Sequence, residues 1–155
     1  MRALRAWARA LVVAGLVVAL DQATKQLAVT NVDKGEPVEV IFGFKLSNVR
    51  NDGIAFGLLE GAGDAFVIAL TLGALCMLVA YFAVHATQQD LWLPVGLVVG
   101  GALGNLADRA RIGAAIDFLD PPLWPAFNLA DIAIVAGVGL LVFSLLAPEP
   151  GDATT

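Results

Sequence analysis

Residues 65–84 read AFVIALTLGALCMLVAYFAV, twenty consecutive residues without a charged side chain. An α-helix needs a run of about this length and apolarity to cross the hydrocarbon core of a bilayer. The rest of the chain has a similar character, since 59% of its 155 residues are hydrophobic, 15% are charged and the mean hydropathy is +0.81. Soluble domains rarely reach such values. The sequence therefore predicts an all-α integral membrane protein.

Three further apolar stretches predict a chain with four transmembrane helices. We expect spans over about residues 7–29, 65–84, 91–106 and 127–146, with long loops over about 30–64 and 107–126. Since each span takes about 20 residues, four spans make one membrane domain, residues 1–155. Arginines precede the first span, as in a secretory signal, but no small-residue cleavage site follows it. We therefore expect an uncleaved first helix.

The first long loop is too long to be only a connector. Within it, apolar side chains alternate with mostly more polar ones, at Val38, Val40, Phe42, Phe44 and Leu46. This period of two is typical of a half-buried strand and predicts a small extracytoplasmic β element on the membrane surface. Asn51-Asp52-Gly53 then reads as a turn, because these residue types tolerate positive φ. Prolines at 121, 122 and 125 exclude a continuous helix in the second long loop.

The distribution of basic residues gives conflicting evidence on the orientation of the chain in the membrane. An even number of spans places both termini on one side and both long loops on the other. The side of the termini holds three basic residues and the other side six: Arg2, Arg5 and Arg9 against Lys25, Lys34, Lys45, Arg50, Arg109 and Arg111. We expect cytoplasmic termini despite this count, because the first helix usually sets orientation and its arginines directly flank the apolar run.

Glycine recurs every four residues in the third span, at Gly96, Gly100 and Gly104. One face of this helix is therefore bare backbone, and such spacing lets a neighbouring helix approach closely. We expect this face to pack tightly, and it would also leave room for an incoming peptide helix.

Polar residues close the third span. Asn105, Asp108 and Arg109 stand at i, i+3 and i+4, which places them on one helical face. They form either a capped helix end with an Asp–Arg surface pair or a cluster that faces the interior of the bundle. We favour the cluster, because ionisable groups at membrane depth are costly and are usually functional.

Two more carboxyls follow in apolar surroundings. Asp117 lies in the stretch 114–119, and Asp131 lies one turn into the fourth span with Asn128 at i−3. Asp131 could simply complement the helix dipole. Two carboxyls that share a site cannot both ionise comfortably and so hold one proton between them, which is the basis of aspartic-peptidase chemistry. Spacing alone allows other pairings of Asp131 equally well, with Asp108 or with Asp21.

Composition also limits the other classes of function. A net charge of −5 with scattered basic residues offers no surface for nucleic acid. One cysteine, Cys76, and one histidine, His85, leave no disulfide and no soft-ligand metal site, so we expect neither a metal nor a cofactor. A proton- or ion-coupled transporter and a membrane scaffold are the alternatives to an enzyme. Neither explains why acids and amides gather at one membrane face beside a long loop.

The ordered motifs resemble the prolipoprotein signal peptidases, the signal peptidase II family of bacterial inner-membrane aspartic peptidases. The resemblance covers residues 10–146, and no single motif is specific, but five in this order are. They are Asp21-Gln22-x-x-Lys25, Asn51-x-Gly53-x-Ala55-Phe56-Gly57, Gly100-Gly101-Ala102-x-Gly104-Asn105-x-x-Asp108-Arg109, Asp117-Phe118 and Pro125-Ala126-Phe127-Asn128-x-Ala130-Asp131.

The resemblance implies roles for particular residues. Asp117 and Asp131 match the catalytic dyad of the family. The residues that orient the dyad and bind the substrate backbone are matched by Asn105, Asp108, Arg109 and Asn128. The loop over the substrate is matched by Asn51, Gly53 and Phe56, and a supporting pair on the first helix is matched by Asp21 and Lys25.

The resemblance also implies an activity. The family cleaves lipoprotein precursors just before a cysteine that carries diacylglycerol, and its site faces the outer side of the bacterial inner membrane. The implied partners are lipid-modified prolipoprotein signal peptides and membrane lipids, and we expect a monomer. The β element and the Asn51 turn would then cover the site as a lid.

Overall fold

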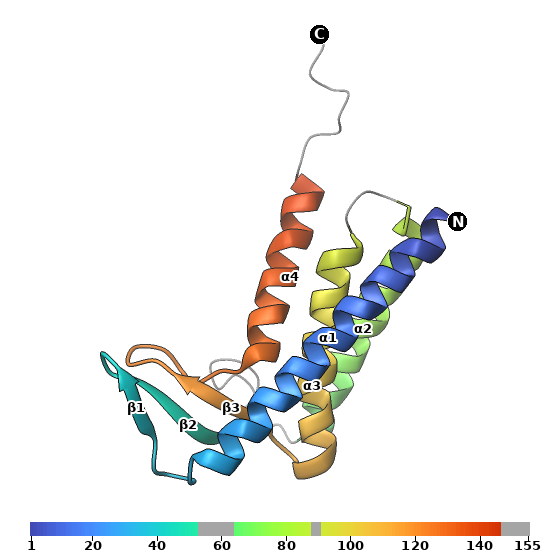
Figure 1. Cartoon of the computed structure of the whole chain (residues 1–155). Helices are drawn as coiled ribbons and strands as arrows, with labels where there is room; N and C mark the ends of the chain where they lie inside the picture. Colours follow the sequence, from blue (N-terminus) through green and yellow to red (C-terminus); the bar gives the residue numbers. More distant parts are fainter. Residues whose placement is uncertain (53–63, 88–90, 147–155) are drawn as a thin grey trace.

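The computed structural model describes residues 1–52, 64–87 and 91–146, and these residues form four helices and a small sheet (Figure 1). The helices are α1 Arg2–Asn31, α2 Asp64–His85, α3 Trp92–Ile112 and α4 Leu129–Leu146. The strands are β1 Val38–Ile41, β2 Phe44–Asn51 and β3 Ala115–Asp120. The mostly helical architecture with a small β element is therefore confirmed.

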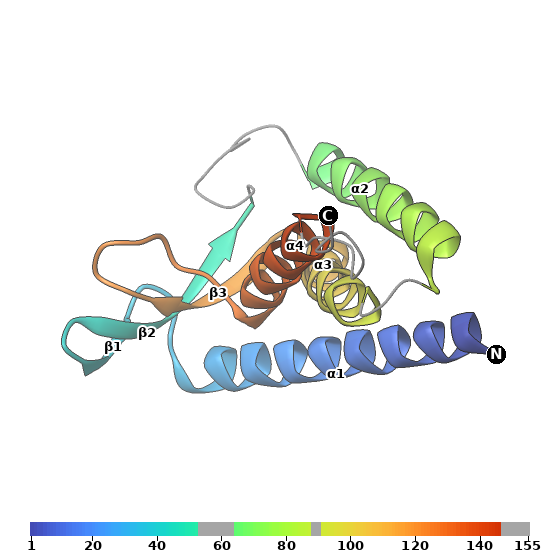
Figure 2. The same ribbon diagram turned by 90° about the horizontal axis from the view of Figure 1, so that it is seen from above.

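Three helices of the described residues, α1, α2 and α4, are long and apolar enough to cross a membrane. Their outward faces carry exposed aliphatic side chains, such as Leu16 on α1 and Leu145 on α4, as lipid-facing helices do. The remaining helix, α3, contacts all three others and is the most deeply buried of the four. Viewed from above, α3 and α4 lie in the centre, with α1 along one side and α2 along the other (Figure 2).

Glycines allow α1 and α3 to approach closely. A Cβ added to Gly96 would lie 2.8 Å from the carbonyl oxygen of Ala10, and one added to Gly100 would lie 2.8 Å from that of Ala14. The predicted close packing of this face is confirmed. The expectation that the same face leaves room for an incoming helix is wrong, because the backbone of α1 already fills it.

The third helix continues well beyond the predicted end at residue 106. It ends at Ile112, and Gly113 adopts a left-handed φ of 75° while its N–H donates to the carbonyl oxygen of Arg109 at 3.0 Å. This is a common helix end, because glycine takes that conformation without a steric cost. The polar residues that seemed to end the span instead lie on two further helical turns.

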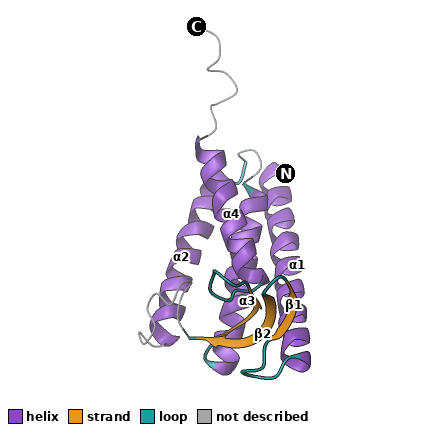
Figure 3. Cartoon of the chain, turned by 90° about the vertical axis from the view of Figure 1, so that its left-hand side faces the viewer, coloured by secondary structure: helices purple, strands orange, loops and turns teal. Residues whose placement is uncertain are grey.

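The β element differs from the prediction in two ways. The alternating segment is a hairpin of β1 and β2, joined by Phe42 and Gly43, and not one strand. The sheet also has a third strand, β3, which comes from the second long loop and pairs antiparallel with β2 (Figure 3). Asn51 ends β2 opposite Ala115, and the turn predicted to follow it includes Gly53, which lies outside the described residues.

Candidate functional site

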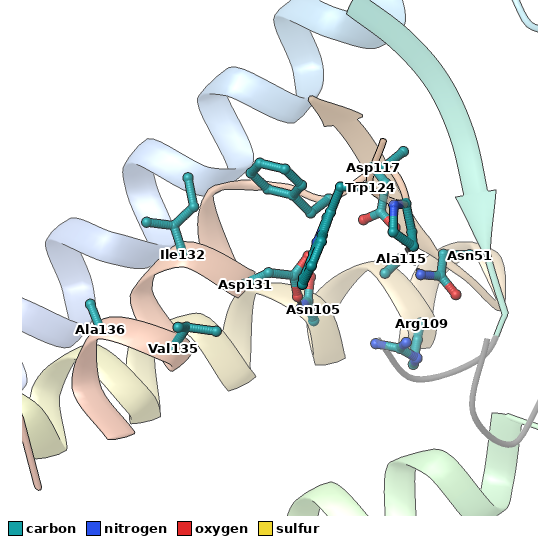
Figure 4. Close-up of a pocket in the computed structure, with 13 residues that line it drawn as sticks. Asn51, Asn105, Arg109, Ala115, Asp117, Trp124, Asp131, Ile132, Val135 and Ala136 are labelled. Carbon is teal, nitrogen blue, oxygen red and sulfur yellow. Dashed lines mark hydrogen bonds between the residues drawn. The ribbon is translucent and has the colours of Figure 1, made fainter. Parts of the chain in front are cut away.

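The site lies where the sheet meets the first turn of α4. A cavity of about 420 Å³ opens there, and the carboxyls of Asp117 from β3 and Asp131 from α4 both face it (Figure 4). The pairing of Asp117 with Asp131, one of three that the sequence allowed, is the one that shares this cavity. The other lining residues are Asn51, Asn105, Arg109, Ala115, Trp124, Pro125, Ala126, Phe127, Ile132, Val135 and Ala136.

Asp131 is fixed by a reciprocal cap at the start of α4. The backbone N–H of Asn128 donates to Oδ2 of Asp131 at 3.0 Å, and the backbone N–H of Asp131 donates to Oδ1 of Asn128 at 3.0 Å. This is the geometry of a capping box, in which two otherwise unpaired helix donors are satisfied together. Asp131 therefore caps the start of α4, and the same carboxyl also lines the cavity.

Asp117 is held by two side-chain amides. Nδ2 of Asn128 donates to its Oδ1 at 2.7 Å, and Nδ2 of Asn51 donates to its Oδ2 at 2.8 Å. Burial raises the pKa of the Asp117 carboxyl to about 6, and the neighbouring Asp131 carboxylate acts in the same direction, while the hydrogen bond from Asn51 opposes both. Since β3 pairs with β2, the sheet itself brings Asn51 and Asp117 together.

A buried lysine sets the orientation of Asn105. Nζ of Lys25 donates to Oδ1 of Asn105 at 2.8 Å, and because an ammonium group can only donate, the amide oxygen must face it. The amide nitrogen of Asn105 therefore points the other way and donates to Oδ1 of Asp131 at 2.9 Å. Asn128 also donates to Oδ1 of Asn105, at 3.0 Å, so the two amides form one network.

Lys25 is compensated by two carboxylates inside the bundle. Its Nζ lies 2.8 Å from Oδ2 of Asp21 and 2.7 Å from Oδ2 of Asp108, and all three residues are at most 1% exposed. Oδ1 of Asp21 also accepts the backbone N–H of Ala130 at 3.0 Å. The cluster thus links α1 and α3 to the first turn of α4, directly beside Asp131.

Two residues outside the predicted site complete this cluster. Arg111 donates to Oδ1 of Asp108 at 2.9 Å and also to the side-chain oxygen of Gln22, and Nε2 of Gln22 donates to the same Oδ1 at 3.1 Å. The surface pair considered from the sequence joined Asp108 to Arg109, whereas Arg109 lines the cavity. The spacing of Asp108 and Arg111, three residues apart on a helix, was a signal that could have identified the pair.

The structure thus brings together all of the predicted site residues that it describes. Asn51, Asn105, Arg109, Asp117 and Asp131 line the cavity. Asn128 and Lys25 donate hydrogen bonds to lining residues, and Asp21 and Asp108 lie behind them in contact with Lys25. Gly53 and Phe56 fall outside the described residues. Within the described ranges, no three His, Cys, Asp or Glu side chains are grouped so as to hold a metal ion.

Comparisons with known proteins identify the family and a similar fold. A family model described as Signal peptidase (SPase) II matches residues 13–147. A lipoprotein signal peptidase of Moorella thermoacetica is 46% identical over 139 residues, covering 89% of this chain and 93% of its own length. One from Pelotomaculum thermopropionicum is 43% identical over 136 residues, covering 87% and 90%. A bacterial membrane enzyme solved by the in meso method at 2.3 Å is similar with a TM-score of 0.84 and 32% identity, covering 94% of this chain and 92% of its own.

Proposed function

Because the chain belongs to the signal peptidase II family of proteases, we propose that it removes signal peptides from lipid-modified bacterial prolipoproteins. The cleaved bond is the one just before the diacylglyceryl cysteine. The names of the relatives support this substrate class, and so do the residues that line the cavity. Its lining runs from two carboxyls to the apolar side chains of Ile132, Val135 and Ala136 along α4, which suits a substrate that is polar at the scissile bond and hydrophobic beyond it.

The proposed chemistry is that of an aspartic dyad. Asp117 and Asp131 share one proton and hold a water molecule between them. The ionised carboxylate takes a proton from this water as the water oxygen attacks the scissile carbonyl carbon, and the protonated carboxyl donates to the carbonyl oxygen. The tetrahedral diol then collapses as its C–N bond breaks. The carboxyl that took the water proton gives it to the cysteine nitrogen, and the other carboxylate regains its proton from a hydroxyl of the diol. The products are the carboxylic acid of the signal peptide and the free amino group of the lipidated cysteine.

The raised pKa of Asp117 supports a shared proton, because a carboxyl with a pKa of about 6 keeps its proton to a higher pH than an ordinary aspartic acid does. The two carboxyls titrate as a pair, so the apparent pKa values of activity belong to the dyad. In this mechanism Asn51, Asn105 and Asn128 hold the carboxyls by donating amide hydrogens, and Asn51 also contributes, with Gly53 and Phe56, to a loop over the substrate. Arg109, which lines the cavity, is proposed to bind the substrate backbone.

We further propose that all four helices span the bacterial inner membrane, with cytoplasmic termini and the cavity near the outer face. The position of Asp131 in the first turn of α4 supports a site at the rim of the bilayer, where a lipid-anchored cysteine would place the scissile bond. The cluster of Asp21, Lys25 and Asp108 has a positioning role, because it holds Asn105 and the first turn of α4.

The observation that carries the proposal is the single cavity into which both carboxyls face. The test is cleavage of a purified diacylglyceryl-modified precursor by Asp117→Asn and Asp131→Asn. Each variant should lose about 10²- to 10⁴-fold or more in rate while still binding the precursor. Asp120→Asn is the matched control, because Asp120 lies at the end of the same strand outside the cavity lining and should cleave normally.

Either Asp variant retaining full cleavage would contradict the dyad. Loss of proton or ion flux in these variants, with precursor processing intact, would instead support a transporter.

A further inference from the structure

One end of the sheet carries large apolar side chains that are more than half exposed. At the turn between β1 and β2, Ile41 is 57% exposed and Phe42 is 94% exposed, and in the loop after β3, Leu123 is 95% exposed. A Cβ on Gly43 would lie 3.6 Å from Cβ of Pro122, so the turn and the loop are neighbours although about 80 residues separate them in sequence. We call Ile41, Phe42 and Leu123 the apolar tip.

Phe42 occupies a backbone conformation that does not suit it. Phe42 and Gly43 form a two-residue hairpin loop with φ values of 48° and 78°, where Asn-Gly is the usual pair. A bulky residue in this left-handed region is strained and needs compensation. Because the side chain is almost fully exposed, the described protein supplies little of it.

The apolar tip is also separate from the cavity, whose lining includes none of its three residues. The compensating contact is therefore not with the part of the substrate that the cavity holds.

The position of the apolar tip identifies what covers it. Leu123 precedes the first residue of the membrane-spanning helix α4, Leu129, by six residues, and Phe127 between them forms a bridge with Leu119 of β3. The loop that carries Leu123 runs along the edge of the sheet beside the first turn of α4 (Figure 1). The opposite end of the sheet, where α1 leads into β1, carries Asp33, Lys34 and Glu36, which are all exposed.

The apolar end of the sheet thus lies toward the start of α4, and the polar end lies away from it (Figure 1). We propose that the apolar tip inserts into the interfacial layer of the leaflet in which α4 begins. The contact fixes the height of β2 and β3, and therefore of Asp117, relative to the bilayer. The proposal rests on the helices spanning a membrane and does not depend on the dyad chemistry.

A depth measurement tests this directly. In a Cys76→Ala background, which removes the single native thiol, an environment-sensitive nitrobenzoxadiazole probe is attached at Phe42→Cys, Leu123→Cys or, as a control, Glu36→Cys. The full-length proteins are reconstituted in phosphatidylglycerol and phosphatidylethanolamine vesicles, with or without lipids brominated near the headgroup. Probes at positions 42 and 123 should be quenched by the brominated lipids and protected from aqueous iodide at least threefold relative to position 36.

Equal iodide access at all three positions would overturn the proposal. Protection from iodide without lipid quenching would also overturn it, because a protein partner or a second copy would then cover the tip. If Phe42→Cys fails to fold, Ile41→Cys reports on the same turn. Phe42→Gly separates strain from insertion, since it should raise the melting temperature in detergent but weaken lipid quenching of a probe at Leu123→Cys.

Discussion

The protein contains two groups of buried carboxylates, and the two groups are stabilised away from water in different ways. Inside the bundle, Asp21 and Asp108 flank the ammonium group of Lys25 at 2.8 and 2.7 Å, so charge is balanced by charge. At the rim, Asp117 takes its hydrogen bonds from the neutral amides of Asn51 and Asn128 and lies close enough to Asp131 to feel its charge. The difference separates a fixed framework from a group whose protonation can change.

The two groups are joined by one residue. Asn105 accepts a hydrogen bond from Lys25 and donates one to Asp131. The buried lysine therefore ensures that the amide nitrogen of Asn105, and not its oxygen, points at the Asp131 carboxyl. A cation placed directly against Asp117 would hold its pKa low and remove the shared proton. Transmitting orientation through a neutral amide avoids this.

The largest stability effect should come from removing the cation of the framework. Lys25→Met leaves Asp21 and Asp108 buried without their shared partner, and breaking such a buried ion pair costs about 3–5 kcal/mol. We expect a correspondingly lower melting temperature in detergent and a large loss of cleavage. Lys34→Met, at an exposed position of the α1–β1 link, is the matched control. A Lys25→Met protein as stable as the wild type would show that the framework carries no charge to compensate.

A smaller effect should follow from moving one carboxylate without removing it. A Cβ at position 104 would lie 2.5 Å from Oδ2 of Asp21, so Gly104→Ala should displace Asp21 from Lys25 and from the backbone of Ala130. We expect a loss of about 1–3 kcal/mol in the free energy of unfolding. Gly139→Ala has open space within 4 Å of the new methyl group and should not destabilise the protein. Equal melting temperatures for the two variants would contradict tight packing around Asp21.

The raised pKa of Asp117 should be detectable in the pH dependence of folding stability. Because the pKa of Asp117 is raised from 3.8 to about 6, the folded state binds more protons than the unfolded state between these values. Stability should therefore fall as pH rises from about 4 to about 6, and the cost should persist above that range. Asp117→Asn should remove this contribution and gain melting temperature relative to the wild type as pH increases. A difference that is flat from pH 4 to pH 8 would show that the pKa of Asp117 is ordinary.

The smallest effect is expected at the exposed edge of the framework. The Arg111 side chain is 61% exposed although it lies 2.9 Å from Asp108, and partly solvated pairs contribute less than about 1 kcal/mol. Arg111→Gln should therefore change the melting temperature by only a few degrees and leave most of the activity. An effect as large as that of Lys25→Met would mean that Arg111, and not Lys25, balances Asp108.

The helices were predictable because the length of an apolar run approximates the length of the helix that it forms, as residues 65–84 illustrate. The end of α3 was not, because a polar residue such as Asp108 reads as the end of a span when it faces a partner inside the bundle. The strand that holds Asp117 was missed because a short apolar stretch does not show which strand it will pair with.

The candidate site residues were more predictable than the strand pairing and the ion pairs that hold them in place. The resemblance of the ordered motifs to a known family singled out Asp117 and Asp131 as a candidate pair, while the cavity that they share depends on a sheet formed by two separate loops. Arg111 was assigned no part in the site, although its spacing of three residues from Asp108 on a helix was a signal for the ion pair that the structure shows.

The most direct test that Asp117 and Asp131 act together on one water molecule is a high-resolution structure of Asp131→Asn bound to an uncleaved diacylglyceryl-modified peptide. The scissile carbonyl should lie between residues 117 and 131, with one water molecule within hydrogen-bond distance of both side chains and the lipid chains beside α4. A scissile bond that binds elsewhere, or a separation of the two side chains too large for one water molecule to contact both, would contradict it.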